Sequence, residues 1–325
     1  MIHIKTAESV TEGHPDKICD KISDAILDEH LKQDPYARVA VETLIKGNTI
    51  VLAGEITSTA TCSYIDIIKH VIQDIGYTKE TGFDIDSISI VNLISTQSPE
   101  IKASVDILGA GDQGIMYGYA CDETKELLPL PVVLVQRIAK ALTDARKEGT
   151  IKHLAPDGKC QVSIVYENNT PLYASSIIIS QQHTKDVNYE KLAQELQEKI
   201  IMPICKNVIT EETIITINGT KSFIIGGPVA DAGVTGRKTA VDTYGGLVKH
   251  GGGAFSGKDP TKVDRSAAYY ARYIAKHIVV KKFAKECEVQ IAYFIGGLTP
   301  TAIDIHCFGT EKIPIHEIQE YVKEN

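Results

Sequence analysis

The feature that most constrains the fold of this chain is a pattern that recurs three times along its 325 residues: an amphipathic helix, a two-stranded hairpin and a second helix. The three copies cover residues 16–34, 37–56 and 64–77, then 132–149, 159–180 and 189–201, and finally 266–284, 287–309 and 316–325. Alternating β-branched residues indicate the hairpin strands, and turn-forming pairs interrupt them at Asn168–Asn169 and Gly296–Gly297. A further strand is expected after the first two copies, at 87–95 and 213–227.

The repeat predicts an α+β protein of three related units, each a mostly antiparallel sheet with helices on one face. We expect an N-terminal unit at 1–98, a central unit at 110–227 and a C-terminal unit at 228–325. The third unit is expected to be truncated, because no strand follows its second helix. A sheet with helices on one face leaves the other face open, and another sheet or subunit must cover it. Oligomerisation is therefore expected.

The charge and composition narrow the classes of partner. A net charge of −8 disfavours general binding to nucleic acid, because a phosphate backbone needs a basic surface. The N-terminus lacks a basic segment followed by an apolar one, and the apolar runs are far shorter than a membrane span. Seven cysteines without a CxxC pair are typical of buried thiols in a reducing compartment. We expect a cytoplasmic protein with no membrane and no nucleic-acid partner.

Two long connections, 95–114 and 226–262, interrupt the repeat. Connections of this length without periodicity are uncommon unless they carry function. Cations outnumber carboxylates from the second connection into the helix that follows it: Arg237, Lys238, Lys249, Lys258, Lys262, Arg265, Arg272 and Lys276 stand against Asp242, Asp259 and Asp264. A cationic, glycine-rich region in an acidic protein predicts a small anionic ligand.

Residues 252–258, "GGAFSGK", match the GxxxxGK pattern of a P-loop, but Asp259 follows where a P-loop needs a hydroxyl for magnesium. No clear hydrophobic strand leads into the glycines either. Glycine still permits close approach of the backbone, and Lys258 and Lys262 flank a helix start, near residue 263, whose free N–H groups favour anions. A flexible glycine hinge with solvated lysines is the alternative.

A second candidate is "GHPDK", at residues 13–17. Pro15 suits the first position of a helix, so His14 should lie just outside the helix and Asp16 in its first turn. A histidine and an aspartate there could hold a phosphate oxygen and its magnesium together. The alternative is that Asp16 only complements the helix dipole and that His14 is a surface residue.

Several further side chains are candidates of lower specificity. The turn "PDGK" presents Asp157 and Lys159 before a strand. In "VETLI", Glu42 points opposite to its neighbours, and Glu55 ends the paired strand, although an isolated strand carboxylate is commonly only exposed to solvent.

The motifs then show a resemblance to a known family. The stretches "GHPDK", "GEIT", "GAGDQG", "GGP", "TGRK", "VDTYGG", "HGGGAFSGKD" and "KVDRSAAY" stand in the order and approximate spacing of S-adenosylmethionine synthetases, also called methionine adenosyltransferases. The resemblance runs from the N-terminus to about "FGTEKIP" and implies the same three-unit architecture. It implies that methionine sulfur attacks C5′ of ATP, that triphosphate leaves intact, and that the enzyme then hydrolyses it to pyrophosphate and phosphate.

The resemblance also implies roles for individual residues. The catalytic set is His14, Lys159, Arg237, Lys238, Lys258 and Lys262. ATP contacts are implied for these except Lys262, and also for Asp157, Ser222, Phe223, Asp231 and Ala254. Methionine contacts are implied for Glu55, Gln97, Asp231 and Lys262. Two Mg²⁺ ions per site are expected, with Asp16 and Asp264 as ligands, and K⁺ with Glu42 as a ligand. Asp112 of "GAGDQG" is expected near the site.

The expected assembly is a homodimer or homotetramer whose active sites draw residues from two subunits. Three departures from the family accompany this expectation: a shorter gating segment from Gln97 to "GAGDQG", Ser222 where the family often has arginine, and an earlier C-terminus. A shorter gate predicts altered closure. Two other functions stay open at this point: a non-catalytic relative that binds ATP or regulates a longer partner, and a P-loop phosphotransferase.

Overall fold

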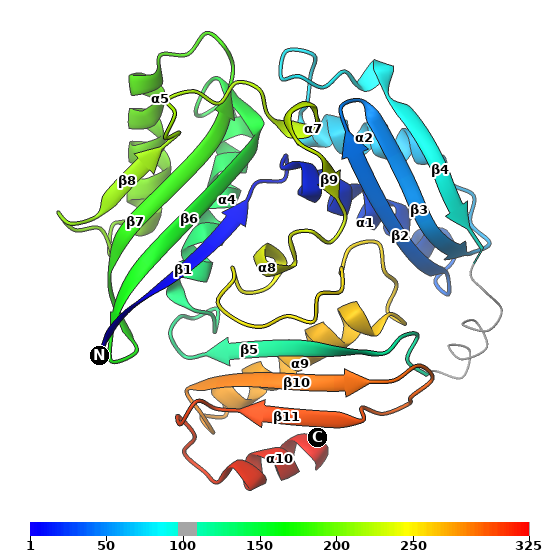
Figure 1. Ribbon diagram of the computed structural model, residues 1–325, viewed down its shortest axis with the longest axis vertical. Helices are drawn as coiled ribbons and strands as arrows, with labels where there is room; N and C mark the ends of the chain where they lie inside the picture. Colours follow the sequence, from blue (N-terminus) through cyan, green and yellow to red (C-terminus); the bar gives the residue numbers. More distant parts are fainter. Residues whose placement is uncertain (97–108, 325) are drawn as a thin grey trace.

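The computed structural model describes residues 1–96 and 109–324, and Gln97 therefore lies outside the described residues. In this part of the chain the strands form three sheets, which surround the centre of the molecule (Figure 1). Each sheet packs against helices of its own unit and has its own buried apolar cluster. The predicted α+β fold of three repeated units is confirmed.

The first unit follows the predicted order closely. Its elements are α1 (Pro15–Gln33), β2 (Arg38–Lys46), β3 (Thr49–Thr57), α2 (Tyr64–Ile75), a 3₁₀ turn (Ile85–Ser87) and β4 (Ser89–Ser95). Helix α1 begins at Pro15 with His14 as its N-cap, as the sequence predicts. Ile18, Ile22 and Ile26 form its buried face, because residues at this spacing lie on one side of a helix. Strand β4 runs parallel to β3, so the sheet is mixed rather than wholly antiparallel.

The second unit contains a longer hairpin. Its elements are α4 (Leu130–Lys147), β6 (Leu154–Glu167), β7 (Thr170–His183), α5 (Tyr189–Leu196), a π turn (Gln197–Ile201), α6 (Met202–Cys205) and β8 (Ile214–Ile217). The predicted turn is confirmed, since Asn168 and Asn169 have φ angles of 50° and 64°. The strand expected over 213–227 is wrong beyond Ile217. Asn218 there has a φ of 42°, and its side chain bonds to the N–H and C=O of Gln181 in place of a continued ladder.

The third unit repeats the pattern with α9 (Val263–Val280), β10 (Glu286–Tyr293), β11 (Ala302–His306) and α10 (Ile315–Glu324). The connection between its strands is longer than the tight turn that the sequence predicts. Gly296 donates its N–H to the carbonyl of Ala110, and Gly297 accepts the N–H of Ala110, so a separate segment takes these bonds. Within the described residues its sheet has the order β11-β10-β5. The truncation of this unit relative to the family stays a prediction.

The three units exchange strands, which the sequence analysis did not anticipate. Strand β1 (Ile2–Val10) pairs with β6, β5 (Gly114–Cys121) with β10, and β9 (Gly233–Val234) with β2. Each exchanged strand lies beside the first strand of a hairpin. Ala7 and Ala120 of β1 and β5 lie in the cores of the second and third units. The units are therefore interlocked across the limits predicted from the sequence, and those limits stay a prediction.

The connection from 226 to 262 occupies the centre between the three sheets and is drawn in yellow in Figure 1. It contains α7 (Gly227–Ala230), β9, α8 (Thr239–Asp242) and an irregular segment that ends at α9. Strand β9 packs against α1, and Gly245 accepts the N–H of Glu8 in β1. The basic stretch is thus placed where all three units meet.

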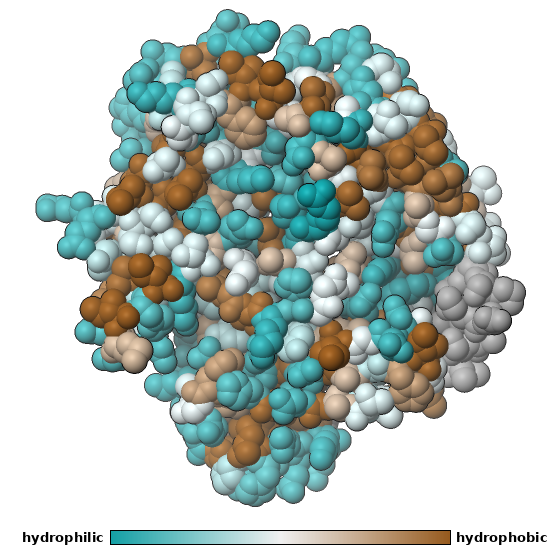
Figure 2. Space-filling view, in the orientation of Figure 1, coloured by the Kyte–Doolittle hydropathy of each residue, from teal (hydrophilic) through white to brown (hydrophobic). Residues whose placement is uncertain are grey.

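The outer face of the β4-β3-β2-β9 sheet is open, as expected for a sheet with helices on one side. Register places Leu44, Val51 and Val91 in one row across the strands, and Glu42, Ala53 and Leu93 in the next. The exposed fractions of Leu44, Val91 and Leu93 are 41%, 42% and 62%. Figure 2 shows hydrophobic side chains gathered over this sheet. We call this outer face, which carries the apolar residues Leu44, Val51, Ala53, Val91 and Leu93, the open apolar face.

Candidate active site

The N-terminus of α1 holds a buried histidine. The His14 side chain is only 2% exposed, and its Nδ1 accepts the N–H of Asp16 at 3.1 Å. Burial, with Lys238 and Lys159 close by, lowers the pKa of His14 to about 4. The ring is therefore neutral at pH 7, and because Nδ1 accepts a bond, Nε2 carries the proton. His14 is a buried donor, which contradicts the alternative of a surface residue.

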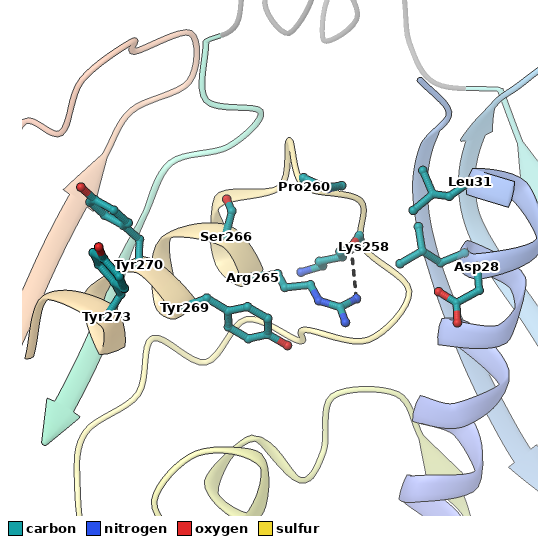
Figure 3. Close-up of a pocket in the computed structure, with 10 residues that line it drawn as sticks. Asp28, Leu31, Lys258, Pro260, Arg265, Ser266, Tyr269, Tyr270 and Tyr273 are labelled. Carbon is teal, nitrogen blue, oxygen red and sulfur yellow. Dashed lines mark hydrogen bonds between the residues drawn. The ribbon is translucent and has the colours of Figure 1, made fainter. Parts of the chain in front are cut away.

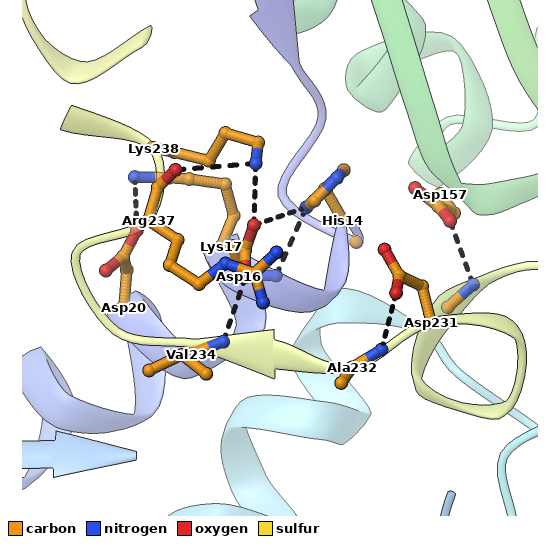
Figure 4. A network of polar contacts seen from close by, with 12 residues as sticks. His14, Asp16, Lys17, Asp20, Asp157, Asp231, Ala232, Val234, Arg237 and Lys238 are labelled. Atoms are coloured by element: carbon orange, nitrogen blue, oxygen red, sulfur yellow. Dashed lines mark hydrogen bonds and ion pairs between the residues drawn. The ribbon is translucent and has the colours of Figure 1, made fainter. Parts of the chain in front are cut away.

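Asp16 bonds helix α1 to the connection 226–262, which we call the central connection (Figure 4). Its carboxylate accepts the N–H of Val234 at 2.9 Å and the ammonium of Lys238 at 2.6 Å, and it lies 3.6 Å from the guanidinium of Arg237. Burial alone would raise the pKa of Asp16, but the bonds from Lys238 and Val234 hold it below its ordinary value. The carboxylate therefore stays charged beside two cations, which is more than complementing a helix dipole requires.

The second unit contributes Asp157 and Lys159 to the region around His14 and Asp16. Asp157 is buried and accepts the N–H of Gly227 at 2.9 Å through Oδ2, while its Oδ1 has no partner within the described residues. Burial raises the pKa of Asp157. The side chain of Lys159 forms neither a hydrogen bond nor an ion pair within the described residues, although it lies close enough to lower the pKa of His14. Asp231 influences the same histidine and accepts the N–H of Ala232.

We call these residues the His14 cluster. Its members are His14, Asp16, Asp157, Lys159, Asp231, Arg237 and Lys238.

Three more predicted ATP contacts lie around this cluster. Phe223 is bonded through its backbone to His183, and Gln182 next to it joins the N–H of Asp157 to the carbonyl of Ile224. Ser222 is exposed on the same segment. Ala254 lies against the turn before Arg237, because a Cβ added at Gly236 would come within 2.4 Å of the Ala254 methyl.

A second group of predicted residues lies at the start of α9. The ammonium of Lys258 is 2.6 Å from the carboxylate of Asp264, and that of Lys262 is 2.7 Å from Asp259. We call Lys258, Lys262 and Asp264 the Lys258 cluster. Lys258 and Arg265 line a cavity of 680 Å³ between α1 and α9, together with Asp28 and Leu31 of α1 and three tyrosines of α9, of which Tyr269 extends toward α1 (Figure 3).

Asp259 gives a structural reason to reject the P-loop alternative. This residue is fully buried, and it accepts the N–H of Val39 and of Thr261 as well as the ammonium of Lys262. Burial alone would raise its pKa, but Lys262 and these bonds hold the pKa of Asp259 below its ordinary value. Its oxygens are used to shape the loop. Helix α9 then begins at Val263, four residues after Asp259 rather than directly after the glycines.

Glu42 and Glu55 lie on the open apolar face. Glu42 is exposed between the buried residues Val41 and Thr43, which confirms the orientation that the sequence predicts. Ala40 is paired with Glu55 in the sheet and also forms a backbone bridge to Lys258, so this face adjoins the Lys258 cluster. Asp112 is exposed and accepts the N–H of the residue that follows it.

A single chain does not bring all the predicted cations together. The Lys238 ammonium is bound at Asp16, in the first turn of α1, whereas Lys258 lines a cavity with Asp28. The carboxylate that binds the Lys258 ammonium is Asp264, in the first turn of α9. One chain therefore holds two separate clusters, each with its own cations and carboxylates.

Sequence analysis missed three charged residues of α1 that support these clusters, Lys17, Asp20 and Asp24. Lys17 donates to Asp242 at 2.6 Å and lies 3.1 Å from Asp20. Asp24 accepts a bond from Arg265 at 2.9 Å. The available signal was the spacing in "DKICDKISDAILD", which places an aspartate at every fourth position from residue 16 to residue 28.

The carboxylates suit hard metal ions. Within the described residues no three metal-binding side chains converge, but Mg²⁺ is usually held by one or two carboxylates together with substrate phosphates. Each predicted magnesium ligand is instead paired with a predicted phosphate ligand, Asp16 with Lys238 and Asp264 with Lys258. The oxygen donors fit Mg²⁺, and the lysines that now neutralise them are the groups that a polyphosphate would attract.

The fold and the site define a class of protein: three interlocked α+β units whose central connection carries cations and carboxylates suited to a polyphosphate and its metal. Comparison with known families agrees with this class. Residues 2–99, 107–223 and 225–325 match the N-terminal, central and C-terminal domains of S-adenosylmethionine synthetase. The chain therefore belongs to the S-adenosylmethionine synthetase family.

Similar curated proteins cover nearly the whole chain. It is 49% identical to the S-adenosylmethionine synthase of Sorangium cellulosum, over 98% of this chain and 78% of that protein. It is 47% identical to the S-adenosylmethionine synthase of Prochlorococcus marinus, over 98% of this chain and 84% of that protein. The corresponding protein of Desulforudis audaxviator is 48% identical over 99% of this chain and 86% of its own length. None of the helices described combines the length and apolar character that crossing a bilayer requires.

Proposed function

We propose that this chain is a methionine adenosyltransferase, which makes S-adenosylmethionine from ATP and L-methionine and releases pyrophosphate and phosphate. The observation that carries the proposal is the His14 cluster: Lys159 and Lys238 lie close to a neutral histidine, and Arg237 lies beside Asp16, in a chain that matches the family throughout. A thioether sulfur is a neutral nucleophile and needs no general base. The site must therefore align sulfur with C5′ and neutralise the departing triphosphate.

Magnitudes explain why several cations are needed. Alignment supplies up to about 7–11 kcal/mol of barrier reduction in well-oriented systems. One cation about 4 Å from a phosphate oxygen interacts by roughly 4 kcal/mol at intermediate dielectric, before desolvation is subtracted. The Lys159 ammonium has no ion-pair partner within the described residues, so it can bind a phosphate without breaking a contact. Lys238 and Lys258 become free when a phosphate replaces Asp16 and Asp264 as their partners.

His14 is suited to the oxygen that bridges C5′ and the triphosphate. Its Nε2 proton can bond to that oxygen as charge develops on it. The neutral ring avoids bringing another full positive charge close to Lys238 and Lys159. We therefore assign His14 as a donor that stabilises the leaving group.

The nucleoside lies, in this proposal, beside the second unit. The unpartnered Oδ1 of Asp157 lacks a donor, which an amino or hydroxyl group of adenosine would supply. Phe223 follows Ser222 on the segment that Gln182 and His183 bind, and Ala254 lies against Gly236, so we propose further nucleoside contacts from Phe223 and Ala254 and a weaker one from Ser222 than arginine would make. Asp231 and Glu55 suit the ammonium of methionine, and Lys262 suits its carboxylate. Gln97 completes the methionine contacts and lies outside the described residues.

Two Mg²⁺ ions and one K⁺ ion are proposed as cofactors. Asp16 and Asp264 would hold Mg²⁺, which neutralises triphosphate charge when bound, and Glu42 would hold K⁺. When a phosphate binds Lys238 and Lys258, the carboxylates of Asp16 and Asp264 lose these partners and become free to bind metal. Removing divalent metal with a chelator should abolish product formation, and adding Mg²⁺ should restore it.

We further propose that the active site forms between two subunits of a cytoplasmic homodimer or homotetramer. The His14 cluster and the Lys258 cluster are separate in one chain, and the second adjoins the open apolar face that a partner would cover. The Lys258 cluster of one subunit would then complete the His14 cluster of the other. Membranes and nucleic acid have no place in this proposal.

Incubation of the pure protein with ATP, methionine, Mg²⁺ and K⁺ tests the proposed activity. S-Adenosylmethionine, pyrophosphate and phosphate should appear in equal amounts. A protein that binds ATP but forms no product at high enzyme concentration would instead be a non-catalytic relative, and co-purification with a longer synthetase would support that outcome.

A further inference from the structure

Helix α1 carries a column of aspartates at positions 16, 20, 24 and 28. Residues four apart lie above one another on a helix, and like charges at this spacing destabilise it. Helix stability therefore does not explain the column. Three of the four carboxylates each accept one backbone N–H from the central connection: Asp16 from Val234, Asp20 from Gly236 and Asp24 from Gly257.

Asp20 holds the turn that carries two of the proposed phosphate ligands. Its Oδ1 accepts the N–H of Gly236 at 2.9 Å, and the hydroxyl of Thr239 donates to the Gly236 carbonyl at 2.9 Å. Gly236 has a φ of 79°, and Arg237 and Lys238 follow it directly. Asp20 is only 3% exposed. The turn is thus fixed on both sides immediately before the cations.

Asp24 holds the turn before Lys258 in the same manner. Its Oδ1 accepts the N–H of Gly257 at 3.0 Å, and the Gly257 carbonyl accepts the N–H of Val41 at 3.0 Å. Gly257 has a φ of 76°. Arg265 donates to the same carboxylate and balances its charge, as Lys17 does beside Asp20.

We propose that Asp20 and Asp24 are positioning residues that fix both cation-bearing turns of the active site to one rigid helix. Neither carboxylate needs to touch substrate, because each acts through the glycine that precedes a cation. The inference rests on the proposed function in one respect, namely that the ligand of these cations is a polyphosphate. It explains the acidic column, since a charged acceptor makes a stronger bond to a backbone N–H than a neutral one.

The test compares Asp20→Ala and Asp24→Ala in the full-length chain with the control Asp66→Ala. Asp66 lies in the first turn of α2, is exposed, and its side chain forms no hydrogen bond or ion pair within the described residues. We expect kcat/KM for ATP to fall about ten- to a hundredfold in the first two variants, because small misplacements of catalytic groups have effects of this size. Affinity for inorganic tripolyphosphate, measured by calorimetry, should fall about tenfold. The control should match the wild type in both measurements.

A merely structural role predicts a different result. The variants would then melt at a lower temperature, but the folded fraction would bind tripolyphosphate with the wild-type dissociation constant, and that outcome would overturn the proposal. Asp20→Asn keeps an oxygen acceptor for Gly236 and should recover part of the lost affinity.

A double-mutant cycle tests whether Asp20 acts through the cations. Asp20→Ala should weaken tripolyphosphate binding much less in a Lys238→Ala background than in the wild type, whereas fully additive losses would contradict the inference. The measurement of tripolyphosphate affinity separates the proposed function from the proposed positioning role. A wild type that binds tripolyphosphate but makes no S-adenosylmethionine contradicts the function and leaves the positioning role standing. An active wild type whose Asp20→Ala and Asp24→Ala variants bind and react normally contradicts only the positioning role.

Discussion

At the residue scale, His14 shows how surroundings decide the chemistry of a side chain. Its position before Pro15 was predictable from sequence, because helix caps depend on local residues. Its lowered pKa was not predictable, since that depends on burial and on Lys238 and Lys159, which lie far away in the chain. The same limit applies to Asp157, whose unpartnered oxygen appears only when the second unit is folded around it.

The lowered pKa of His14 predicts a pH dependence of stability. The unfolded chain binds a proton at this residue near pH 6.5, whereas the folded chain binds one only near pH 4. The free energy of unfolding should therefore fall as the pH is lowered from 6.5 to 4, by up to about 3 kcal/mol from this residue. Urea unfolding of the wild type and of His14→Gln at several pH values measures the difference. The two proteins should diverge as the pH falls, and parallel curves would show that His14 titrates normally.

At the element scale, the sequence predicts the helices and hairpins well because their periodicity is local. Strands β1, β5 and β9 were missed because their partners lie in other units, and pairing across such distances leaves no local signal. The separation of Lys258 from Lys238 was unpredictable for the same reason. Both lie in or beside one glycine-rich connection, yet the Lys238 ammonium binds Asp16 in α1 whereas the Lys258 ammonium binds Asp264 in α9.

The loop before α9 provides a prediction at this scale. Gly257 has a φ of 76°, and a Cβ there would lie 2.1 Å from the Val41 carbonyl. Gly257→Ala should therefore lower the free energy of unfolding by about 3 kcal/mol or more, through backbone strain and steric overlap. Gly252→Ala is the matched control. Gly252 has a φ of 87° but no atom within 4 Å of an added Cβ, so about 1 kcal/mol is expected. Urea titration at one protein concentration measures both, and equal losses would count against the steric explanation.

At the scale of the whole molecule, the open apolar face predicts self-association. Leu93→Lys places a charge at the most exposed apolar side chain of this face and should convert an oligomer to monomers. Val280→Lys is the control, because Val280 is equally exposed, at 62%, but lies at the end of α9. Light scattering after size exclusion gives the masses. Unchanged assembly of Leu93→Lys would exclude this face as the interface.

Two inactive variants should restore activity to each other if the site is shared between subunits. Lys238→Ala and Lys258→Ala each damage both sites of a homodimer, but a mixed dimer has one site with both substitutions and one with neither. After subunit exchange, an equal mixture should reach about a quarter of wild-type activity, as random pairing of a symmetric dimer requires. Mixing Lys238→Ala with Arg237→Ala should restore none, since both belong to the His14 cluster. A Lys238→Ala and Lys258→Ala mixture that stays inactive would mean that each chain builds its own site.

The pairing of β1 with β6 has a consequence for how the chain is made. Ile2 lies opposite Glu167, so the first strand leaves the ribosome long before its partner exists. At about 5–20 residues per second, translation keeps β1 waiting for roughly ten to thirty seconds. Its apolar side chains must remain unpaired through that interval, and the second unit completes its sheet only by capturing the start of the chain. Nascent chains halted shortly before residue 167 should therefore be the ones most in need of a chaperone.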